Sequence, residues 1–165
     1  MHTSNTNHIL TTIVTNGQPG AGAAGLDWAI AHDLSHGGWC SKLPSKKSNL
    51  QAKYDLQETP STGYLNSLAA NVRDSDATIV FTLTPELSTL GMHAMDAACA
   101  EVKPILHFRP SVHPKWIASF IARNNVNVLH IVGAREIAEP GIFDFVMLSL
   151  DLALRSVRTD LLVAA

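Results

Sequence analysis

The chain has 165 residues, of which 46% are hydrophobic and only 16% are charged. Average domains carry about 25% charged residues, so this chain has ample apolar surface, and disorder is excluded for most of its length. Its formal net charge is −2, which excludes a basic nucleic-acid-binding protein because there is no positive excess to neutralise phosphates. The low charge also fits a protein that hides part of its surface in a homo-oligomer.

Cys40 and Cys99 are far apart in the sequence, and we interpret both as free, buried thiols in a reducing compartment. The first residues lack the basic start and apolar run of a secretory signal, and no run of about 18 apolar residues is present to span a membrane. We therefore expect a cytoplasmic protein without a membrane partner. Residues 1–8 are expected to be flexible, and the lack of an internal repeat or linker predicts one domain over 1–165.

The first half of the chain predicts a strand, a glycine-rich loop and a helix. Residues 9–15 are β-branched and apolar, which indicates a buried strand, and apolar residues at helical spacing follow the glycines. Residues 36–39 are expected to form a short second strand, and residues 40–60 a long loop. Ser61 or Thr62 is expected to cap a helix that contains residues 64–72.

The second half alternates strands and helices. The predicted strands are 77–83, 104–108 and 126–132, and the predicted helices are 89–100, 114–124 and 142–158. Within the first of these helices, Met92, Met95 and Cys99 share one face. Such alternation predicts an α/β fold with a mainly parallel sheet and helices on both faces. In such sheets ligands bind beyond the carboxyl ends of the strands, which directs attention to the loops 16–25, 84–91, 109–113 and 133–141.

The stretch N-G-Q-P-G-A-G-A-A-G at 16–25 follows the first strand. Glycines let the backbone approach a ligand closely, and a helix N-terminus favours an anion. Gly17, Gly20 and Gly22 are therefore a candidate cradle, with the Gln18 amide able to donate or accept. The alternative is a glycine-rich turn that only permits tight packing. No lysine follows, so the stretch is not a P-loop.

In H-G-G-W-C-S-K at 36–42, two glycines beside Trp39 would let a ligand ring lie close to the backbone. His36 and Cys40 could also bind a metal, but two ligands are half of a zinc site. The alternative is a bulged edge strand with a buried Trp39.

In L-S-T-L-G-M-H at 87–93 a helix begins after the central strand, with Ser88 and Thr89 as capping residues. If the first and central strands are neighbours, this helix N-terminus would face the one at Gly22 and form an anion site. Capping alone would explain the same residues. His93 lies on the first turn of this helix and is a further candidate.

Arg135, at the end of the last strand, could bind a phosphate or carboxylate with two hydrogen bonds. The rival interpretation is an ion pair with Glu136 or Glu139. Asp74 and Asp76 precede the central strand, and we expect them to end a helix and pair with Arg73. The eight histidines show no metal-binding spacing, and no nucleophile elbow is visible.

Together these motifs resemble the molybdenum carrier protein family, part of a broader Rossmann-like group of nucleotide-binding proteins. The resemblance rests on five blocks in order, over about residues 10 to 155: NGQPGAGAAGLDWA, HGGWCSK, YDLQETPSTGYLNSLAANVRDSDATIVF, KPILHF and LHIVGAREIAEPGIF. It implies a Rossmann-like, doubly wound fold, a homo-oligomer, often a tetramer, and binding of the molybdenum cofactor, a pterin with a terminal phosphate.

Several positions depart from the family pattern. Asn16 stands where the family has glycine, Pro19 where it has threonine, and Gly22 where it has an acidic residue. Ala134 stands in place of proline and His130 in place of asparagine. The departures leave the ligand open, and the histidines His93 and His130 suggest a bare oxyanion such as molybdate or tungstate.

From the motifs and the resemblance we expect a non-catalytic carrier for the molybdenum cofactor, a related phosphorylated pterin or an oxyanion. The expected ligand-binding residues are Gly17, Gln18, Pro19, Gly20, Gly22, Trp39, Ser88, Thr89, Gly91, Met92, His93, Gly133, Arg135 and Glu136. One alternative is a nucleoside-monophosphate glycosidase, although TLGMHAMDAACAE lacks the GGxGT turn and a well-placed glutamate of those enzymes. Another is an oligomeric scaffold with a vestigial site. The apolar helix over 142–162 is the first candidate for an oligomer interface.

Overall fold

The computed structural model describes residues 10–42 and 53–163, with side chains as far as residue 155. The strands are β1 (Thr12–Val14), β2 (Ser35–Gly37), β3 (Trp39–Cys40), β4 (Gln57–Glu58), β5 (Ala77–Phe81), β6 (Ile105–Phe108) and β7 (Val128–Gly133). The helices are α1 (Ala21–Ala31), α3 (Tyr64–Arg73), α4 (Thr89–Ala100), α5 (Lys115–Arg123) and α6 (Ile142–Val163). The expected flexibility of residues 1–8 concerns a segment outside the described residues.

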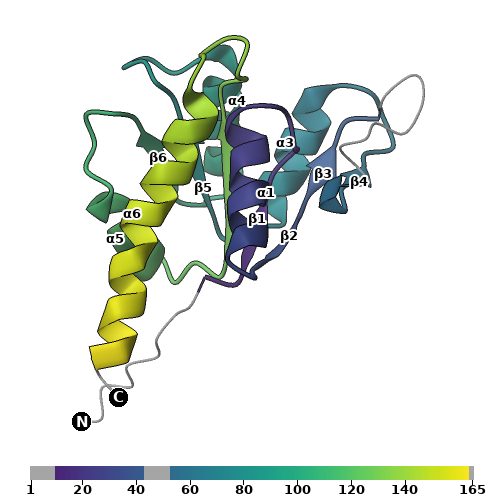
Figure 1. Cartoon of the computed structure of the whole chain (residues 1–165). Coiled ribbons are helices and arrows are strands. Elements are labelled where there is room, and N and C mark those ends of the chain that lie inside the picture. Colours follow the sequence, from purple (N-terminus) through teal and green to yellow (C-terminus); the bar gives the residue numbers. More distant parts are fainter. Residues whose placement is uncertain (1–9, 43–52, 164–165) are drawn as a thin grey trace.

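The centre of the fold is a five-stranded sheet in the order β2-β1-β7-β5-β6, in which every pairing is parallel. Helices cover both faces of the sheet (Figure 1). The predicted α/β architecture with a doubly wound parallel sheet is therefore confirmed. A parallel sheet places all strand carboxyl ends at one edge, so the loops after β1, β5 and β7 meet there.

The larger core lies between the sheet and α1, α5 and α6. Ile13, Ile79, Leu129 and Ile131 point from the strands into this layer, and all four are almost fully buried. Three aromatic rings extend the core toward β6: the centroid of Phe108 lies 5.5 Å from that of Phe81 and 5.7 Å from that of Phe145. This layer holds the sheet rigid beneath its carboxyl edge.

The other face of the sheet is covered by α3 and α4. Val80 and Val132 pack there against Leu68 of α3 and Ala94 of α4. His130 shares this face with Val132, because side chains two residues apart on a strand point the same way. It is 1% exposed, and its Nδ1 lies 3.1 Å from Thr78 Oγ1. Burial lowers the pKa of His130 to about 3, so the ring is neutral at physiological pH.

Some predicted elements differ from the structure. Residues 36–39 do not form one strand, because Gly37 ends β2 and Trp39 begins β3, which belongs to a separate two-stranded sheet with β4. The expected long loop 40–60 therefore contains β4, whose two residues are too few to leave a periodic pattern. Gly63, rather than Ser61 or Thr62, is the N-cap of α3, and no side chain caps that end.

The burial of α4 also differs from the prediction. Its buried residues are Gly91, Ala94 and Ala98, whereas Met92 is 50% exposed and Cys99 is exposed. Small residues face the sheet because the helix packs close to it, so the stripe with the larger side chains points away. The two cysteines form no disulfide, and only Cys40 is buried as expected. Among the described helices, none has the length and apolar character needed to cross a membrane.

Candidate functional site

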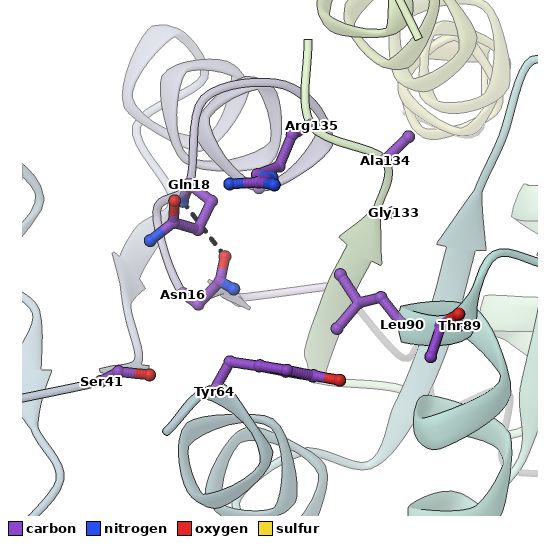
Figure 2. Close-up of a pocket in the computed structure, with 10 residues that line it drawn as sticks. Asn16, Gln18, Ser41, Tyr64, Thr89, Leu90, Gly133, Ala134 and Arg135 are labelled. Carbon is purple, nitrogen blue, oxygen red and sulfur yellow. Dashed lines mark hydrogen bonds between the residues drawn. The ribbon is translucent and has the colours of Figure 1, made fainter. Parts of the chain in front are cut away.

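A cavity of about 390 Å³ opens at the carboxyl edge of the sheet. Its lining residues are Asn16, Gln18, Gly22, Ser41, Tyr64, Thr89, Leu90, Gly133, Ala134 and Arg135. In Figure 2, Gln18 and Arg135 lie on one side of the cavity, and Tyr64 and Leu90 on the other. The volume falls within the range of about 300–1,000 Å³ that is usual for small-molecule sites.

Two helix N-termini flank this cavity. Helix α1 begins at Ala21 after β1, and α4 begins at Thr89 after β5. The strands β1 and β5 are not neighbours, because β7 lies between them, so the condition under which the two helix N-termini were expected to face each other is not met as stated. The cavity therefore spans three strands, with Gly133 at the end of β7 between the two helices.

Three backbone amides at these helix N-termini have no partner among the described residues. In α1, the N–H of Ala21 donates to Ala134 O and that of Ala23 donates to Gln18 O. The N–H of Gly22, between them, makes no such bond. In α4 the Ser88 hydroxyl accepts from Gly91 N at 3.3 Å. The N–H groups of Thr89 and Leu90 have no partner among the described residues. Gly22, Thr89 and Leu90 all line the cavity, so the positive ends of both helix dipoles converge on it.

Two of the predicted cradle glycines have packing roles. A Cβ on Gly20 would lie 2.5 Å from Ala134 O, and a Cβ on Gly17 would lie 2.6 Å from Leu56 Cδ1. Both residues also have positive φ values, 120° and 70°. Neither lines the cavity. The alternative of a glycine turn that permits tight packing therefore describes these two residues.

Gly22 and Gly133 do line the cavity. A Cβ on Gly133 would lie 2.3 Å from Phe81 O, so this position requires glycine to keep β7 close to β5. A Cβ on Gly22 would lie 2.9 Å from Asn16 Oδ1. The Asn16 side chain thus occupies space that a side chain at position 22 would need, and these two departures from the resembled pattern fit one another. The same Oδ1 accepts from Gln18 N at 3.1 Å (Figure 2).

Arg135 is the one charged residue that lines the cavity. It forms no ion pair with the described carboxylates, and the proposed pairing with Glu136 or Glu139 is wrong. Glu139 accepts from Leu83 N at 2.5 Å. Glu136 accepts from Gly141 N at 2.6 Å and Phe143 N at 3.0 Å. The Arg135 guanidinium is exposed and available to a ligand.

Glu136 was expected to contact the ligand, but its carboxylate binds the N-terminus of α6 instead. Hydrogen bonds from the Gly141 and Phe143 amides lower the pKa of Glu136. A carboxylate is stabilised at a helix N-terminus by the free amides and the dipole. Its role in this structure is to cap the start of α6.

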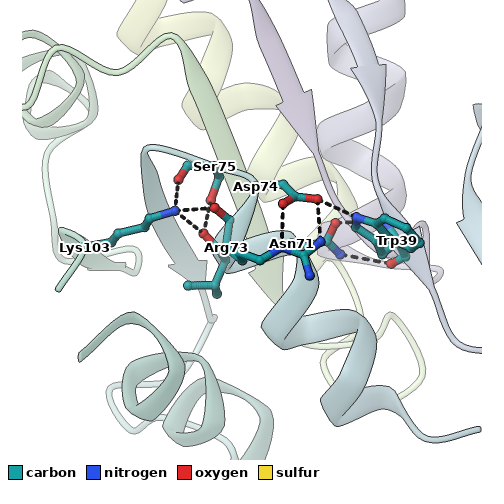
Figure 3. Close-up of polar contacts among 7 residues, drawn as sticks. Trp39, Asn71, Arg73, Asp74, Ser75 and Lys103 are labelled. Atoms are coloured by element: carbon teal, nitrogen blue, oxygen red, sulfur yellow. Dashed lines mark hydrogen bonds and ion pairs between the residues drawn. The ribbon is translucent and has the colours of Figure 1, made fainter. Parts of the chain in front are cut away.

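Trp39 was expected to pack on a ligand ring, but the structure places it in a polar network outside the cavity (Figure 3). Its indole Nε1 donates to Asp74 Oδ2 at 2.7 Å, and its backbone is held on both sides by the Asn71 amide. Asp74 also pairs with Arg73 at 2.7 Å, and these bonds lower the pKa of Asp74, Arg73 being the larger cause. The predicted Arg73–Asp74 pair is confirmed.

The same network closes the end of α3. Lys103 donates to the carbonyl oxygens of Val72, Arg73 and Ser75 (Figure 3). These oxygens lie at the helix C-terminus, where a cation is stabilised. Asp76 accepts from Asn127 N and Val128 N rather than pairing with Arg73. The network is therefore structural.

Tyr64 is a cavity residue that no sequence motif identified. It is 45% exposed at the start of α3, and its ring centroid lies 6.0 Å from that of His93. In the sequence Tyr64 resembles any apolar residue of an amphipathic helix, so no pattern marks it. Asn16, Ser41, Leu90 and Ala134 were missed as well.

Of the predicted site residues, five line the cavity: Gln18, Gly22, Thr89, Gly133 and Arg135. His93 reaches it only through Tyr64. The others that the structure places outside the lining are Gly17, Pro19, Gly20, Trp39, Ser88, Gly91, Met92 and Glu136. The suggestion that His130 meets an anion is wrong, because the ring is buried within the sheet layer. No group of three metal-binding side chains occurs in the described part of the chain.

Comparison with known proteins places this geometry in a family. The profile of the circularly permutated YpsA SLOG family matches residues 13–154. The chain belongs to this family. A solved structure of a protein from Syntrophus aciditrophicus SB, named putative molybdenum carrier protein, is 30% identical and superposes with a TM-score of 0.80. The match covers 88% of this chain and 95% of that one. Among curated proteins, none matches the chain.

Proposed function

We propose that this protein binds a small phosphorylated or oxyanionic ligand in the cavity and does not transform it. The observation that carries the proposal is the meeting of three amides and Arg135 in one cavity. Among the described residues, the amides of Gly22, Thr89 and Leu90 have no hydrogen-bond partner, and Arg135 has no carboxylate partner. An anion placed there would receive backbone hydrogen bonds and one charge-assisted contact. Because these contacts come from backbone amides and one arginine, the anion can be bound without a basic surface, in agreement with the net charge of −2.

The molybdenum cofactor is the ligand that we favour. Its terminal phosphate would lie at the helix N-termini, within reach of Arg135, and its flat pterin ring would pack on Tyr64, which faces the cavity from the opposite side (Figure 2). Aromatic rings stack with planar heterocycles at modest gain per contact. The relative named as a molybdenum carrier supports this choice. Molybdate or tungstate alone would use the amides and Arg135 without Tyr64.

A carrier role is favoured over catalysis by the lining itself. None of the ten described residues that line the cavity is Asp or Glu, so this lining offers no carboxylate as a general acid or base. Cleavage of a nucleoside monophosphate by a glycosidase would need such a group. The name of the structural relative also points to a carrier.

We further propose that the protein forms a homo-oligomer through α6. Leu148 and Leu152 lie one turn apart on this helix and are 58% and 53% exposed. Large apolar side chains grouped on one helix face mark protein interfaces. This would account for part of the low charge of the surface.

The cofactor assignment is tested by purifying the protein from cells supplied with molybdate. Metal analysis by mass spectrometry, with fluorescence of oxidised pterin, should show both molybdenum and pterin at a comparable fraction of the protein. Arg135→Ala should lose most of both, whereas Arg155→Ala, which removes an arginine on α6 away from the cavity lining, should retain them. Molybdenum without pterin would indicate the bare oxyanion. Neither group on the wild type would reject the assignment.

A further inference from the structure

A second surface of the molecule has an unusual charge distribution. Between residues 102 and 135 the chain has five Lys or Arg and no Asp or Glu, although its formal net charge is −2. The rest of the chain therefore has a formal net charge of −7. This stretch forms β6, α5 and β7, and the first two border a groove. Lys103 binds carbonyl oxygens at the end of α3 and Arg135 lines the cavity described above. The cations of the stretch that remain for the groove are Arg109, Lys115 and Arg123.

The groove lies between α5 and β6 and has a volume of about 380 Å³. Strand β6 is at the edge of the sheet and pairs with β5 in the described structure. The apolar residues of the groove are Leu106, Val112, Trp116 and Phe120. It is separate from the cavity described above, since the two share no lining residue.

Helix α5 has two apolar faces. Ile117 and Ile121 are 0% and 5% exposed and fill the core. Trp116 and Phe120, one turn apart, point into the groove, and Trp116 remains 46% exposed. Phe120 also packs against the core, whereas Trp116 is not among the residues of that cluster. Exposed Trp beside Arg is a combination that is enriched at the energetic centres of protein interfaces.

The cations near the groove have no carboxylate partner among the described residues. Arg123 lines it, one turn beyond Phe120, and Lys115 Nζ lies 5.9 Å from the Trp116 ring centroid. Neither forms an ion pair with a described carboxylate. Arg109, in the loop that supplies Val112, donates to Ser111 Oγ and to Pro85 O and has no carboxylate partner among the described residues. The groove thus combines an apolar floor with cations that no carboxylate of the described residues pairs with.

We propose that the groove between α5 and β6 binds an acidic segment of another protein, with an apolar side chain seated on Trp116 and Phe120 and carboxylates facing Lys115 and Arg123. Charge complementarity selects this occupant. A second copy docked by the same face would bring Lys115 and Arg123 of both copies together, and like charges across an interface are costly. A nucleic-acid duplex would use the cations but leave the apolar floor without a matching partner, and a single strand, whose bases could stack on Trp116, is an arm of the test below. The proposal does not depend on what the cavity binds.

The test uses fluorescence anisotropy with a labelled decapeptide in which glutamates flank a central Phe-Leu pair. The controls are a peptide with lysine in place of each glutamate and one with Ser-Ser in place of Phe-Leu. The acidic Phe-Leu peptide should bind, and both controls should bind at least about 10-fold more weakly, the difference that 1.4 kcal/mol gives. The affinity should fall as salt rises.

Variants locate the site. Arg123→Glu and Trp116→Ala should each weaken the acidic peptide by at least about 5-fold, whereas Lys42→Glu, an exposed cation next to β3, should change it by less than about 2-fold. Circular dichroism should show a folded protein for both variants, with little change in thermal unfolding for Trp116→Ala. Arg123→Glu should lower the free energy of unfolding by about 1 kcal/mol at most, because it places a negative charge in the last turn of α5. The proposal is overturned if the acidic peptide shows no binding at about 1 mM, or if both groove variants bind it as the wild type does. It is equally overturned if a single-stranded oligonucleotide binds while the peptide does not, or if Arg123→Glu changes the oligomeric state instead of peptide affinity.

Discussion

Replacing Gly20 with alanine tests how the loop that carries Arg135 is held beside α1. Gly20 has φ 120°, a value that side chains rarely adopt, and its Cβ would lie 2.5 Å from Ala134 O and 2.6 Å from Glu136 N. Both atoms are in backbone hydrogen bonds that join the two loops, Ala21 N to Ala134 O at 3.1 Å and Glu136 N to Pro19 O at 3.0 Å. The added methyl group must push these two loops apart.

The magnitude follows from two contributions. Backbone strain at such φ costs about 1–3 kcal/mol, and loss of the two hydrogen bonds costs about 1 kcal/mol each. The variant Gly63→Ala measures the first contribution alone. Gly63 has φ 113°, but no atom lies within 4 Å of the place where its new methyl group would be, so only backbone strain results. Any gain from a less flexible unfolded chain is the same for both variants.

The assay is urea unfolding followed by circular dichroism. We expect Gly63→Ala to lower the free energy of unfolding by about 1–3 kcal/mol, and Gly20→Ala to lower it by about 2 kcal/mol more. If Gly20→Ala is no less stable than Gly63→Ala, the close approach of the 134–136 loop to Gly20 does not hold in solution. Ligand affinity should also fall in Gly20→Ala, since Arg135 would move.

Three further predictions concern other parts of the molecule. The pKa of His130 falls from 6.5 to about 3 on folding, so between these pH values the unfolded chain binds one proton more than the folded chain. The free energy of unfolding should therefore decline as the pH drops below about 6.5, by up to about 1.4 kcal/mol per pH unit. His130→Leu should flatten this part of the profile of urea midpoint against pH, and an unchanged slope would mean that the buried imidazole is not its source. Glu136→Gln should lower the thermal midpoint at neutral pH, because its carboxylate binds the α6 amides, and calorimetric titration should find anion affinity unchanged; a selective loss of affinity would restore Glu136 as a ligand residue. Light scattering should give a mass above 17.8 kDa for the wild type and a shift toward the monomer for Leu148→Glu/Leu152→Glu, whereas a wild-type monomer would contradict the α6 interface.

Local patterns predicted the elements of this fold well. The β-branched run predicts β5, and Ser88 predicts the start of α4, because burial of a strand and capping of a helix depend on residues that are adjacent in the sequence. The order of the strands in the sheet could not be predicted in this way, since nothing in the residues of β1 and β5 shows that β7 lies between them. That insertion decides which loops form the cavity.

The same limit applies to single site residues. Arg135 and Glu136 are adjacent and equally polar, yet one lines the cavity and the other binds the start of α6. Trp39 looks like a ligand platform beside two glycines, but its indole is taken by Asp74, 35 residues away in the chain. Tyr64 gives no local sign of its position because only the packing of α3 against the carboxyl edge exposes it to the cavity.

The central claim is that the cavity between α1 and α4 binds a small anion through free amides and Arg135. Isothermal titration calorimetry with molybdate, inorganic phosphate and adenosine monophosphate, each on the wild type and on Arg135→Ala, measures this directly. We expect saturable binding of at least one of these anions, weakened about 10-fold or more by Arg135→Ala, as loss of a charge-assisted contact predicts, and little changed by Arg155→Ala. Absence of heat with all three anions, or equal affinity in the wild type and Arg135→Ala, would contradict the claim.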